Sequence, residues 1–347
     1  MTHEIFLPDL EAGWKWPRRI SPYIPEIRQE CLDWVASFKA FTPEAQKAFD
    51  RCNFNLLTGL SYPWLTKDQL RCACELMNLF FLFDEHSDKS DASEVWNQVG
   101  VIMDAFRNPD KARPQDEWIG GEVARQFWSR TIQISTPTFQ RRFLESWEEY
   151  LQGTAQQAED RCSSHIRNVT SYLEIRRRTI GARPSFNILE MDMNVPDEVM
   201  GHPTIRELES LATDLTIIAN DILSYNKEQA SGDDEHNLIT IAMKEHNTDV
   251  QGAINWTAKL HAEMVRRFNK LYLQIPRWGG PLDMDIQTYV NGMAQWVGAN
   301  VQWSYESERY FGKRGLEIKK TKVLCLLPKT ATEGGKIGPV VVDDASL

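Results

Sequence analysis

The 347-residue sequence lacks the features that define several large classes of protein. Its formal net charge is −10, whereas a nucleic-acid-binding protein needs a basic surface to neutralise phosphates. No apolar run approaches the roughly 18–20 residues of a membrane-spanning helix. The N-terminus has neither the basic flank nor the apolar stretch of a signal peptide. We therefore expect a cytoplasmic protein that binds no nucleic acid and has no stable membrane association.

Several common site signatures are also missing. The 6 cysteines form no Cys-x-x-Cys pair, which argues against a disulfide framework or a zinc site. The chain has no glycine-rich phosphate loop, no Gly-x-Ser-x-Gly elbow and no His-Glu-x-x-His motif. These absences exclude the usual sequence signatures of nucleotide binding, serine hydrolysis and zinc-dependent hydrolysis. No internal repeat is detectable, which argues against a solenoid.

Helical periodicity dominates the chain, and strand signals are almost absent. Thr66 with Gln69 forms a capping-box pattern that predicts the start of a helix running toward Asp88. Thr204 with Glu207 gives the same pattern before a second long helix. No shift in composition marks a linker between domains. The sequence therefore predicts one large all-α bundle.

The two ends of the chain differ in composition from the helical part. Residues 1–24 are rich in proline and aromatic side chains, which predicts an extended arm lying over the surface. Residues 25–314 carry the helical pattern and form the predicted domain. Residues 315–347 include Gly334-Gly335 and an acidic end, and we expect this tail to be largely disordered.

The second long helix carries polar side chains at helical spacing. Asn220, Ser224 and Glu228 lie at i, i+4 and i+8, and each step of four residues rotates only about 40° around a helix. Their amide, hydroxyl and carboxylate oxygens therefore share one face and suit a hard divalent cation such as Mg²⁺. Lys227 adds a positive charge that would attract an anion carried by the metal. The alternative is that these residues form the solvent-exposed face of an amphipathic helix.

Paired carboxylates follow the apolar helix segment 79–83. Asp84 and Asp88 lie at i and i+4 on one face, with Glu85 about 100° away. Carboxylates at this place are costly unless a cation neutralises them, and bridging Mg²⁺ ions would do so. The alternative is an exposed helix end that carries acids. If this carboxylate cluster and the Asn220-Ser224-Glu228 cluster both bind metal, the two favour metal-assisted departure of a diphosphate.

Two arginines are candidate anion ligands, because a guanidinium matches the oxygens of a phosphate. They are Arg177 and Arg309, and Tyr310 could donate a further hydrogen bond. The alternative for the basic cluster 176–178 is a solvated helix face.

Aromatic side chains near these motifs could stabilise a cation over their π faces. Phe81 lies three residues before Asp84, and Trp303 precedes Arg309 on the last long helix. For most other aromatic residues, packing in the core is the better explanation.

Taken together, these motifs resemble those of the class I terpene synthases, in particular the fungal sesquiterpene synthases. Asp84-Glu85-His86-Ser87-Asp88 resembles the family's aspartate-rich motif, with Glu where many members have Asp. Asn220-Asp221-x-x-Ser224-x-x-Lys227-Glu228 matches the Asn-Ser-Glu triad, and Arg309-Tyr310 matches the C-terminal pair. Arg177 with Gly181 matches the diphosphate-sensing arginine and the effector glycine. The motifs follow the family's order over about residues 5–312.

The resemblance implies the class I terpenoid synthase fold, an α-helical bundle with a central active-site cavity. It implies Mg²⁺ as the cofactor, with three ions expected and Mn²⁺ as a substitute. The implied site comprises metal ligands (Asp84, Asp88, Asn220, Ser224, Glu228), diphosphate ligands (Arg177, Lys227, Arg309, Tyr310) and residues that act on the carbocation (Phe81, Gly181, Trp303).

The implied substrate is farnesyl diphosphate, with inorganic diphosphate released, in a monomer or homodimer. Within the family, the sequence is most similar to the group that forms Δ6-protoilludene through an initial 1,11-ring closure. One alternative is a sesquiterpene synthase with another product. A second is an isoprenyl chain-elongating enzyme, which would carry a second aspartate-rich motif instead of the Asn-Ser-Glu triad. A third is a non-catalytic helical module, which predicts no metal dependence.

Overall fold

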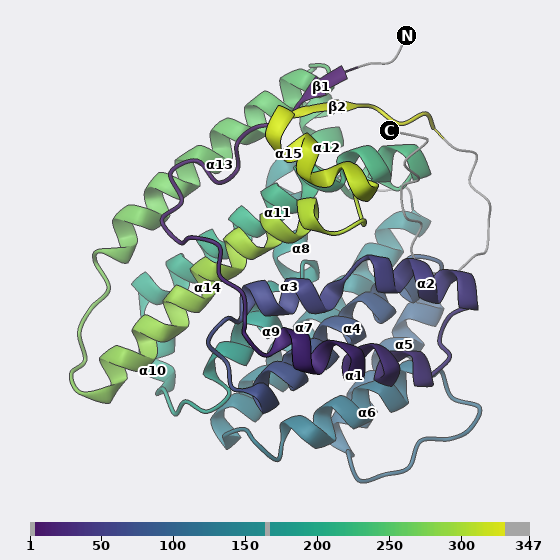
Figure 1. Cartoon of the computed structure of the whole chain (residues 1–347), viewed down its shortest axis with the longest axis vertical. Helices are drawn as coiled ribbons and strands as arrows, with labels where there is room; N and C mark the ends of the chain where they lie inside the picture. Colours follow the sequence, from purple (N-terminus) through teal and green to yellow (C-terminus); the bar gives the residue numbers. More distant parts are fainter. Residues whose placement is uncertain (1–3, 164–166, 330–347) are drawn as a thin grey trace.

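Helix α4 (Lys67–Ser87) runs through the interior of the protein, whose computed structural model describes residues 4–163 and 167–329 (Figure 1). The predicted capping box is confirmed, because Thr66 Oγ1 accepts from the Gln69 backbone N–H and the Gln69 side chain bonds back to the Thr66 N–H. Almost every residue from Gln69 to Phe83 is buried. A helix that is covered on all sides must lie at the centre of the packing.

The remaining elements confirm the predicted all-α bundle. The helices that precede residue 190 are α1 (Ile24–Ser37), α2 (Pro43–Arg51), α3 (Phe54–Ser61), α5 (Ala92–Arg107), α6 (Gly120–Thr131), α7 (Pro137–Cys162), α8 (Val169–Thr179), α9 (Ala182–Asn187) and the short 3-10 helix η1 (Ile188–Glu190). The later ones are α10 (Asp197–Met200), α11 (Pro203–Ser231), η2 (Asp234–His236), α12 (Leu238–Glu245), α13 (Val250–Tyr272), α14 (Pro281–Glu306), η3 (Gly312–Arg314) and α15 (Gly315–Thr321). No helix in the described ranges is long and apolar enough to cross a membrane.

Helix α11 packs against both α13 and α14, so its polar face is held at a fixed place in the bundle. The predicted capping box of Thr204 with Glu207 is wrong. The N-cap is His202, two residues before Thr204, and the helix begins at Pro203. The His202 imidazole accepts from the Thr204 N–H. Proline is favoured at the first helical position because it has no N–H to leave unpaired. Glu207 instead accepts from Arg267 of α13.

A ladder of aromatic rings joins α7 to its neighbours. Phe143 stacks on Trp147 of the same helix at 5.7 Å between ring centroids, and on Trp128 of α6 at 5.1 Å. Trp147 in turn lies 4.4 Å from Phe80 of α4. Buried aromatic pairs of this kind add to the stabilisation from apolar burial, and here they fix α4 relative to α6 and α7.

The N-terminal arm follows α13 and α14 before it reaches α1, as its purple trace shows in Figure 1. Trp14 Nε1–H donates to the Ala294 carbonyl of α14, and Trp16 Nε1–H donates to Asn291 Oδ1. The Trp14 ring also packs against Phe268 of α13 at 5.0 Å. These long-range contacts explain why a segment without helical periodicity has a defined path.

The expected disorder of the tail is wrong for its first part. Residues 315–329 contain α15 and the strand β2 (Val323–Cys325), which pairs antiparallel with β1 (Glu4–Phe6). The pairing buries Ile5 and Leu324 against each other across the strands. Residues 330–347, which complete the predicted tail, lie outside the described ranges.

A buried histidine in α13 predicts a loss of stability in acid. The His261 side chain is buried, and burial lowers its pKa to about 4. The unfolded chain takes up a proton below about pH 6.5, whereas the folded state keeps the imidazole neutral until about pH 4. The free energy of unfolding should therefore fall by about 2 kcal/mol between pH 7 and pH 5 from this group alone.

Urea unfolding of wild type and His261→Leu at both pH values measures this contribution. The variant should show a correspondingly smaller decrease in the free energy of unfolding. His246→Leu, at an exposed position, is the control and should behave like wild type. Equal decreases in wild type and His261→Leu would refute the assignment to His261.

Candidate active site

Arg309 lies between the acidic end of α4 and an aromatic wall. Its Nη1 donates to Glu85 Oε1 at 3.2 Å, and its Nη2 lies 3.6 Å from Asp84 Oδ2. The guanidinium carbon lies over the rings of Phe81, at 4.9 Å, and Phe54, at 5.6 Å. Only 8% of the Arg309 side chain is exposed. A buried cation therefore joins the predicted acidic motif to the predicted C-terminal pair.

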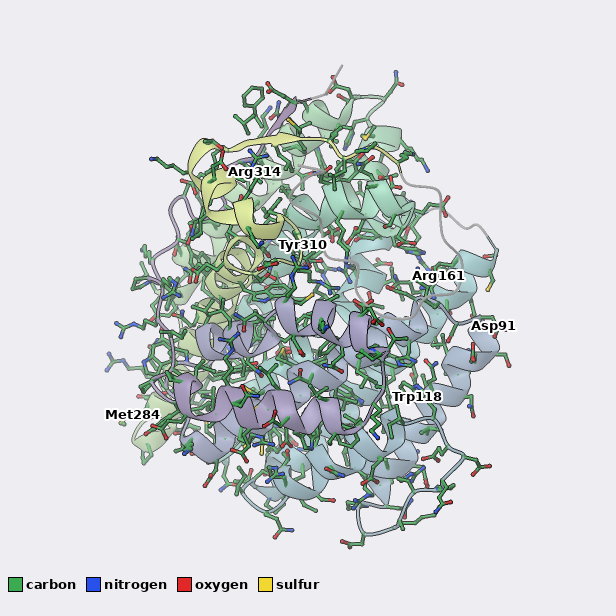
Figure 2. All side chains as sticks on the ribbon, turned by 45° about the vertical axis from the view of Figure 1, so that its right-hand side comes forward. Asp91, Trp118, Arg161, Met284, Tyr310 and Arg314 are labelled. Atoms are coloured by element: carbon green, nitrogen blue, oxygen red, sulfur yellow. The ribbon has the colours of Figure 1, made fainter. Side chains whose placement is uncertain are left out.

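Tyr310 extends this connection to α11. Asn220 Nδ2 donates to Tyr310 Oη at 3.1 Å, and Asn220 Oδ1 accepts from Arg176 Nη2 at 2.8 Å. Figure 2 labels Tyr310 on the segment that also carries Arg314. The structure thus brings together four parts of the chain that are far apart in sequence: the end of α4, α8, α11 and residues 309–310.

The structure places Arg176, and not the predicted Arg177, in this site. Arg177 forms a bidentate pair with Asp214, at 2.7 and 2.8 Å, and 41% of its side chain is exposed. The physical reason is the helix phase, because adjacent residues on a helix point about 100° apart. Arg176 follows buried Tyr172 by four residues and so shares the buried face of α8. That spacing is the sequence signal that identifies Arg176.

Asn237 holds the last of the predicted metal ligands on α11. Its Nδ2 donates to Glu228 Oε2 at 2.9 Å and to the Asp221 carbonyl at 2.9 Å, and it lies 3.5 Å from Ser224 Oγ. Its Oδ1 caps α12 by accepting from the Ile239 N–H. The start of α12 therefore fixes the carboxylate of Glu228.

Asp221 holds Arg176 in a similar way. Its Oδ2 accepts from Tyr172 Oη at 2.6 Å and from the Leu238 N–H at 3.0 Å, while Oδ1 lies 3.6 Å from Arg176 Nη2. Desolvation raises the pKa of Asp221, and Arg176 and Tyr172 act in the opposite direction. Neither Asp221 nor Asn237 was among the predicted site residues, because their roles depend on contacts between separate helices.

The two predicted aspartates of α4 have different surroundings. Asp84 is half-buried; desolvation raises its pKa, while Arg309, Arg176 and Lys227 act in the opposite direction. These three cations therefore surround the acidic end of α4. Asp88 is exposed and lies 3.6 Å from Arg161 of α7.

The predicted oxygen ligands fit a hard divalent cation. Asn220, Ser224 and Glu228 present three oxygen-bearing groups in sequence along α11, and Asp84 adds a carboxylate from α4. Desolvation, followed by the charge of Asp221, raises the pKa of Glu228, so a cation nearby would favour its ionised form. No group of three His, Cys, Asp or Glu side chains suited to a metal occurs in residues 4–163 or 167–329. A metal ion bound here would therefore need the amide and hydroxyl oxygens as well.

An aromatic wall adjoins the charged groups. Phe81 stacks on Phe54 at 3.7 Å, and the Trp303 ring lies 5.8 Å from each of them. Trp303 Nε1–H donates to the Cys52 carbonyl at 2.8 Å, which satisfies the polar atom of this buried side chain. Phe54 was not predicted, since a phenylalanine at a helix start carries no pattern of its own.

Gly181 lies at the turn between α8 and α9 and needs to be glycine for two reasons. Its φ is +72°, a left-handed conformation that favours glycine. A Cβ atom would also lie 2.9 Å from Phe80 Cε1. The predicted effector glycine therefore packs against Phe80, the residue that precedes Phe81 on α4.

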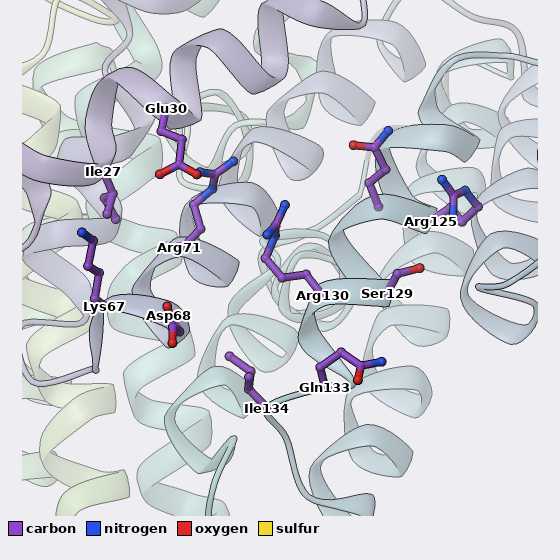
Figure 3. Close-up of a pocket in the computed structure, with 11 residues that line it drawn as sticks. Ile27, Glu30, Lys67, Asp68, Arg71, Arg125, Ser129, Arg130, Gln133 and Ile134 are labelled. Carbon is purple, nitrogen blue, oxygen red and sulfur yellow. The ribbon is translucent and has the colours of Figure 1, made fainter.

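A separate hollow of about 530 Å³ lies between α1, α4 and α6, and most of the residues that line it are polar or charged. Figure 3 shows Glu30 facing Arg71, with Arg130 beside them. Both arginines pair with the buried Glu75 carboxylate. None of the predicted site residues, all of which are described, lines this hollow.

Solved structures share this fold. The protein is similar to an α-eudesmol synthase, with a TM-score of 0.76 and 20% identity over 84% of this chain and 97% of that chain. It is also similar to a single-residue variant of a cucumene synthase, with a TM-score of 0.75 and 22% identity over 84% and 99% of the two chains. These likenesses show that the protein has the class I terpenoid synthase fold.

The sequence comparisons place the chain within a family. Residues 75–267 match the family described as "Terpene synthase family 2, C-terminal metal binding". The chain is 51% identical to a Delta(6)-protoilludene synthase of Stereum hirsutum over 99% of this chain and 93% of the relative. It is 49% identical to a Delta(6)-protoilludene synthase of Armillaria gallica over 100% of both chains. The chain belongs to the terpene synthase family.

Diphosphate binding can test whether Arg176, rather than Arg177, is the anion ligand. Inorganic diphosphate with Mg²⁺ should raise the Tm of wild type, because a ligand that binds only the folded state stabilises it. Arg176→Ala should weaken diphosphate binding by about 10- to 100-fold, the usual effect of losing a charge-assisted hydrogen bond. Arg177→Ala should retain most of the ligand-induced shift.

Thermal scans with and without ligand measure the shift against the Tm of each ligand-free variant. This comparison removes any direct effect of the substitution on stability. Arg176→Lys keeps the charge and controls for loss of the ion pair with Asp221. A large loss of the shift in Arg177→Ala, with none in Arg176→Ala, would restore the sequence-based assignment.

Proposed function

We propose that the protein is a Mg²⁺-dependent sesquiterpene synthase, a carbon–oxygen lyase that ionises farnesyl diphosphate and cyclises the resulting carbocation. The observation that supports this proposal best is the convergence of two oxygen clusters, on α4 and α11, with Arg176 and the buried Arg309. Such a site can hold a metal-bound diphosphate in one place. Δ6-protoilludene, formed through an initial 1,11-ring closure, is the proposed product, supported by relatives of that name with 47–51% identity.

The proposed metal ligands are Asp84, Asp88, Asn220, Ser224 and Glu228. Three Mg²⁺ ions, for which Mn²⁺ could substitute, would neutralise the diphosphate and make it a better leaving group. The protein's own contribution is to fix the oxygens in advance. Asn237 holds Glu228, and Tyr310 holds Asn220, so little reorganisation is needed when the ligand binds.

The proposed diphosphate ligands are Arg176, Lys227, Arg309 and Tyr310. They come from three parts of the chain and carry three positive charges toward one anion. In the described structure Arg309 pairs with Glu85 and Asp84, which keeps the buried guanidinium neutralised until an anion arrives. Fixed cations that face the leaving group stabilise the charge that develops as the carbon–oxygen bond breaks.

The proposed role of the aromatic wall is to protect and stabilise the carbocation. The rings of Phe81 and Phe54 lie against the Arg309 guanidinium, and Trp303 packs beside them. A diphosphate held by Arg309 would leave the positive carbon near these rings when it departs. The Trp303 N–H is engaged with the Cys52 carbonyl, so its only polar atom is already bonded. A wall without free polar atoms holds little water that could quench the cation.

Product analysis tests this proposal. With farnesyl diphosphate and Mg²⁺, gas chromatography with mass spectrometry should show a sesquiterpene hydrocarbon whose spectrum and retention match Δ6-protoilludene. Asn220→Ala should lower kcat/KM at least about 100-fold, because it removes a metal ligand and the partner of Arg176. The helix content of this variant should stay at the wild-type level.

Asn97→Ala provides the control, since it removes the same side chain from an exposed position on α5. A different hydrocarbon skeleton would refute the product but not the class. Formation of longer prenyl diphosphates instead of a hydrocarbon would refute the class. Wild-type turnover in a folded Asn220→Ala variant would refute the metal site.

A further inference from the structure

The C-terminal segment leaves the site at Tyr310 and returns to the same helix. Tyr310 binds Asn220 of α11, and the chain then forms η3, α15 and β2. Beyond β2, the Leu327 N–H donates to Asn226 Oδ1, also on α11, at 2.8 Å. Both ends of segment 310–327 are therefore fastened to the helix that carries the proposed metal ligands.

The side chain of Asn226 binds this segment as a neighbouring strand would. Its Nδ2 donates to the Cys325 carbonyl at 3.1 Å, while its Oδ1 accepts from the Leu327 N–H. One amide thus pairs with the donor and the acceptor of an extended backbone two residues apart. Gln229, one turn further along α11, adds a bond from Nε2 to the Leu327 carbonyl at 2.8 Å. Asn226 is 1% exposed, so these bonds are shielded from water.

The small sheet needs such support. Each strand has 3 residues, and an isolated pair of strands is at best marginally stable in water. The other strand is held in a similar way, because Gln251 of α13 accepts from the Phe6 N–H and donates to the Phe6 carbonyl. The sheet is therefore bound to α13 through β1, and the chain that follows β2 is bound to α11.

Arg309 depends on its backbone to stay in place. Its Nε is buried and has no hydrogen-bond partner among the described residues. Its ion pair with Asp84 is long, at 3.6 Å. The contacts of the guanidinium are therefore not enough to fix the Arg309 side chain. Its place also depends on the backbone on either side of Arg309.

We propose that Asn226 is a positioning residue for the diphosphate ligands. By holding residues 325–327 against α11, Asn226 keeps segment 311–324 in place and so keeps Arg309 and Tyr310 in the site. The catalytic consequence rests on the proposed function, whereas the structural coupling does not. Asn226 lies directly before Lys227, so the same turn of α11 carries one proposed anion ligand and the group that secures two others, Arg309 and Tyr310.

Hydrogen exchange measures the coupling without any turnover. Asn226→Ala should speed amide exchange at least about tenfold at 323–327 and at 309–314, because two buried hydrogen bonds are lost. Asn226→Asp keeps the acceptor for the Leu327 N–H and should recover part of the protection. Gln251→Ala is the matched control: it releases the other strand and should speed exchange mainly at 4–6.

Kinetics with farnesyl diphosphate then separate the positioning role from plain stability. Asn226→Ala should raise KM about tenfold with a smaller change in kcat, since the affected groups bind the diphosphate. Asn226→Asp should lie between this variant and wild type. Gln251→Ala should stay near wild type.

The outcomes separate this proposal from the proposed function. If Asn226→Ala speeds exchange at 323–327 but not at 309–314, and KM is unchanged, the amide holds only the tail and the proposal is wrong. Equal effects of Asn226→Ala and Gln251→Ala at 309–314 would assign the coupling to the sheet as a whole and also overturn it. If wild type turns over no prenyl diphosphate, the proposed function fails, and the exchange data still decide the coupling.

Discussion

The position of Arg309 against the acidic end of α4 is the constraint on which the site depends. An arginine that is 8% exposed needs charged partners, and Glu85 and Asp84 supply them. The acids in turn would be costly at the end of a buried apolar helix without this cation. Each side therefore requires the other, and the requirement ties the last part of the chain to the central helix.

Other groups of the candidate site are held by neutral or oppositely charged partners. Asn237 and Tyr310 hold the last and first proposed metal ligands of α11, while Asp221 holds Arg176. These partners come from the start of α12, the C-terminal segment and α11 itself. Under the proposed function, the ligand oxygens and the cations would be in position before any ion or anion binds, which would reduce reorganisation during catalysis.

The sequence could predict those features whose signal is local. The capping box at Thr66 and the spacing of Asn220, Ser224 and Glu228 each depend on a few neighbouring residues, and the structure has the predicted helix at both places. Motif order was enough to indicate the family, since it does not require knowledge of contacts. The sequence motif indicated Arg177, whereas the structure brings Arg176 to Asn220. The difference depends on the phase of α8, which the buried Tyr172 marks.

Features that depend on distant partners were out of reach. The strand after α15 forms because β1 lies beside it, and nothing near Val323 in the sequence reveals that pairing. The amides of Asn226 and Gln251 look like ordinary helix-surface residues until the backbones that they bind are in place. The order of residues 315–329 is thus a property of the whole fold. Side-chain amides on two helices supply hydrogen bonds that a pair of three-residue strands cannot provide for itself.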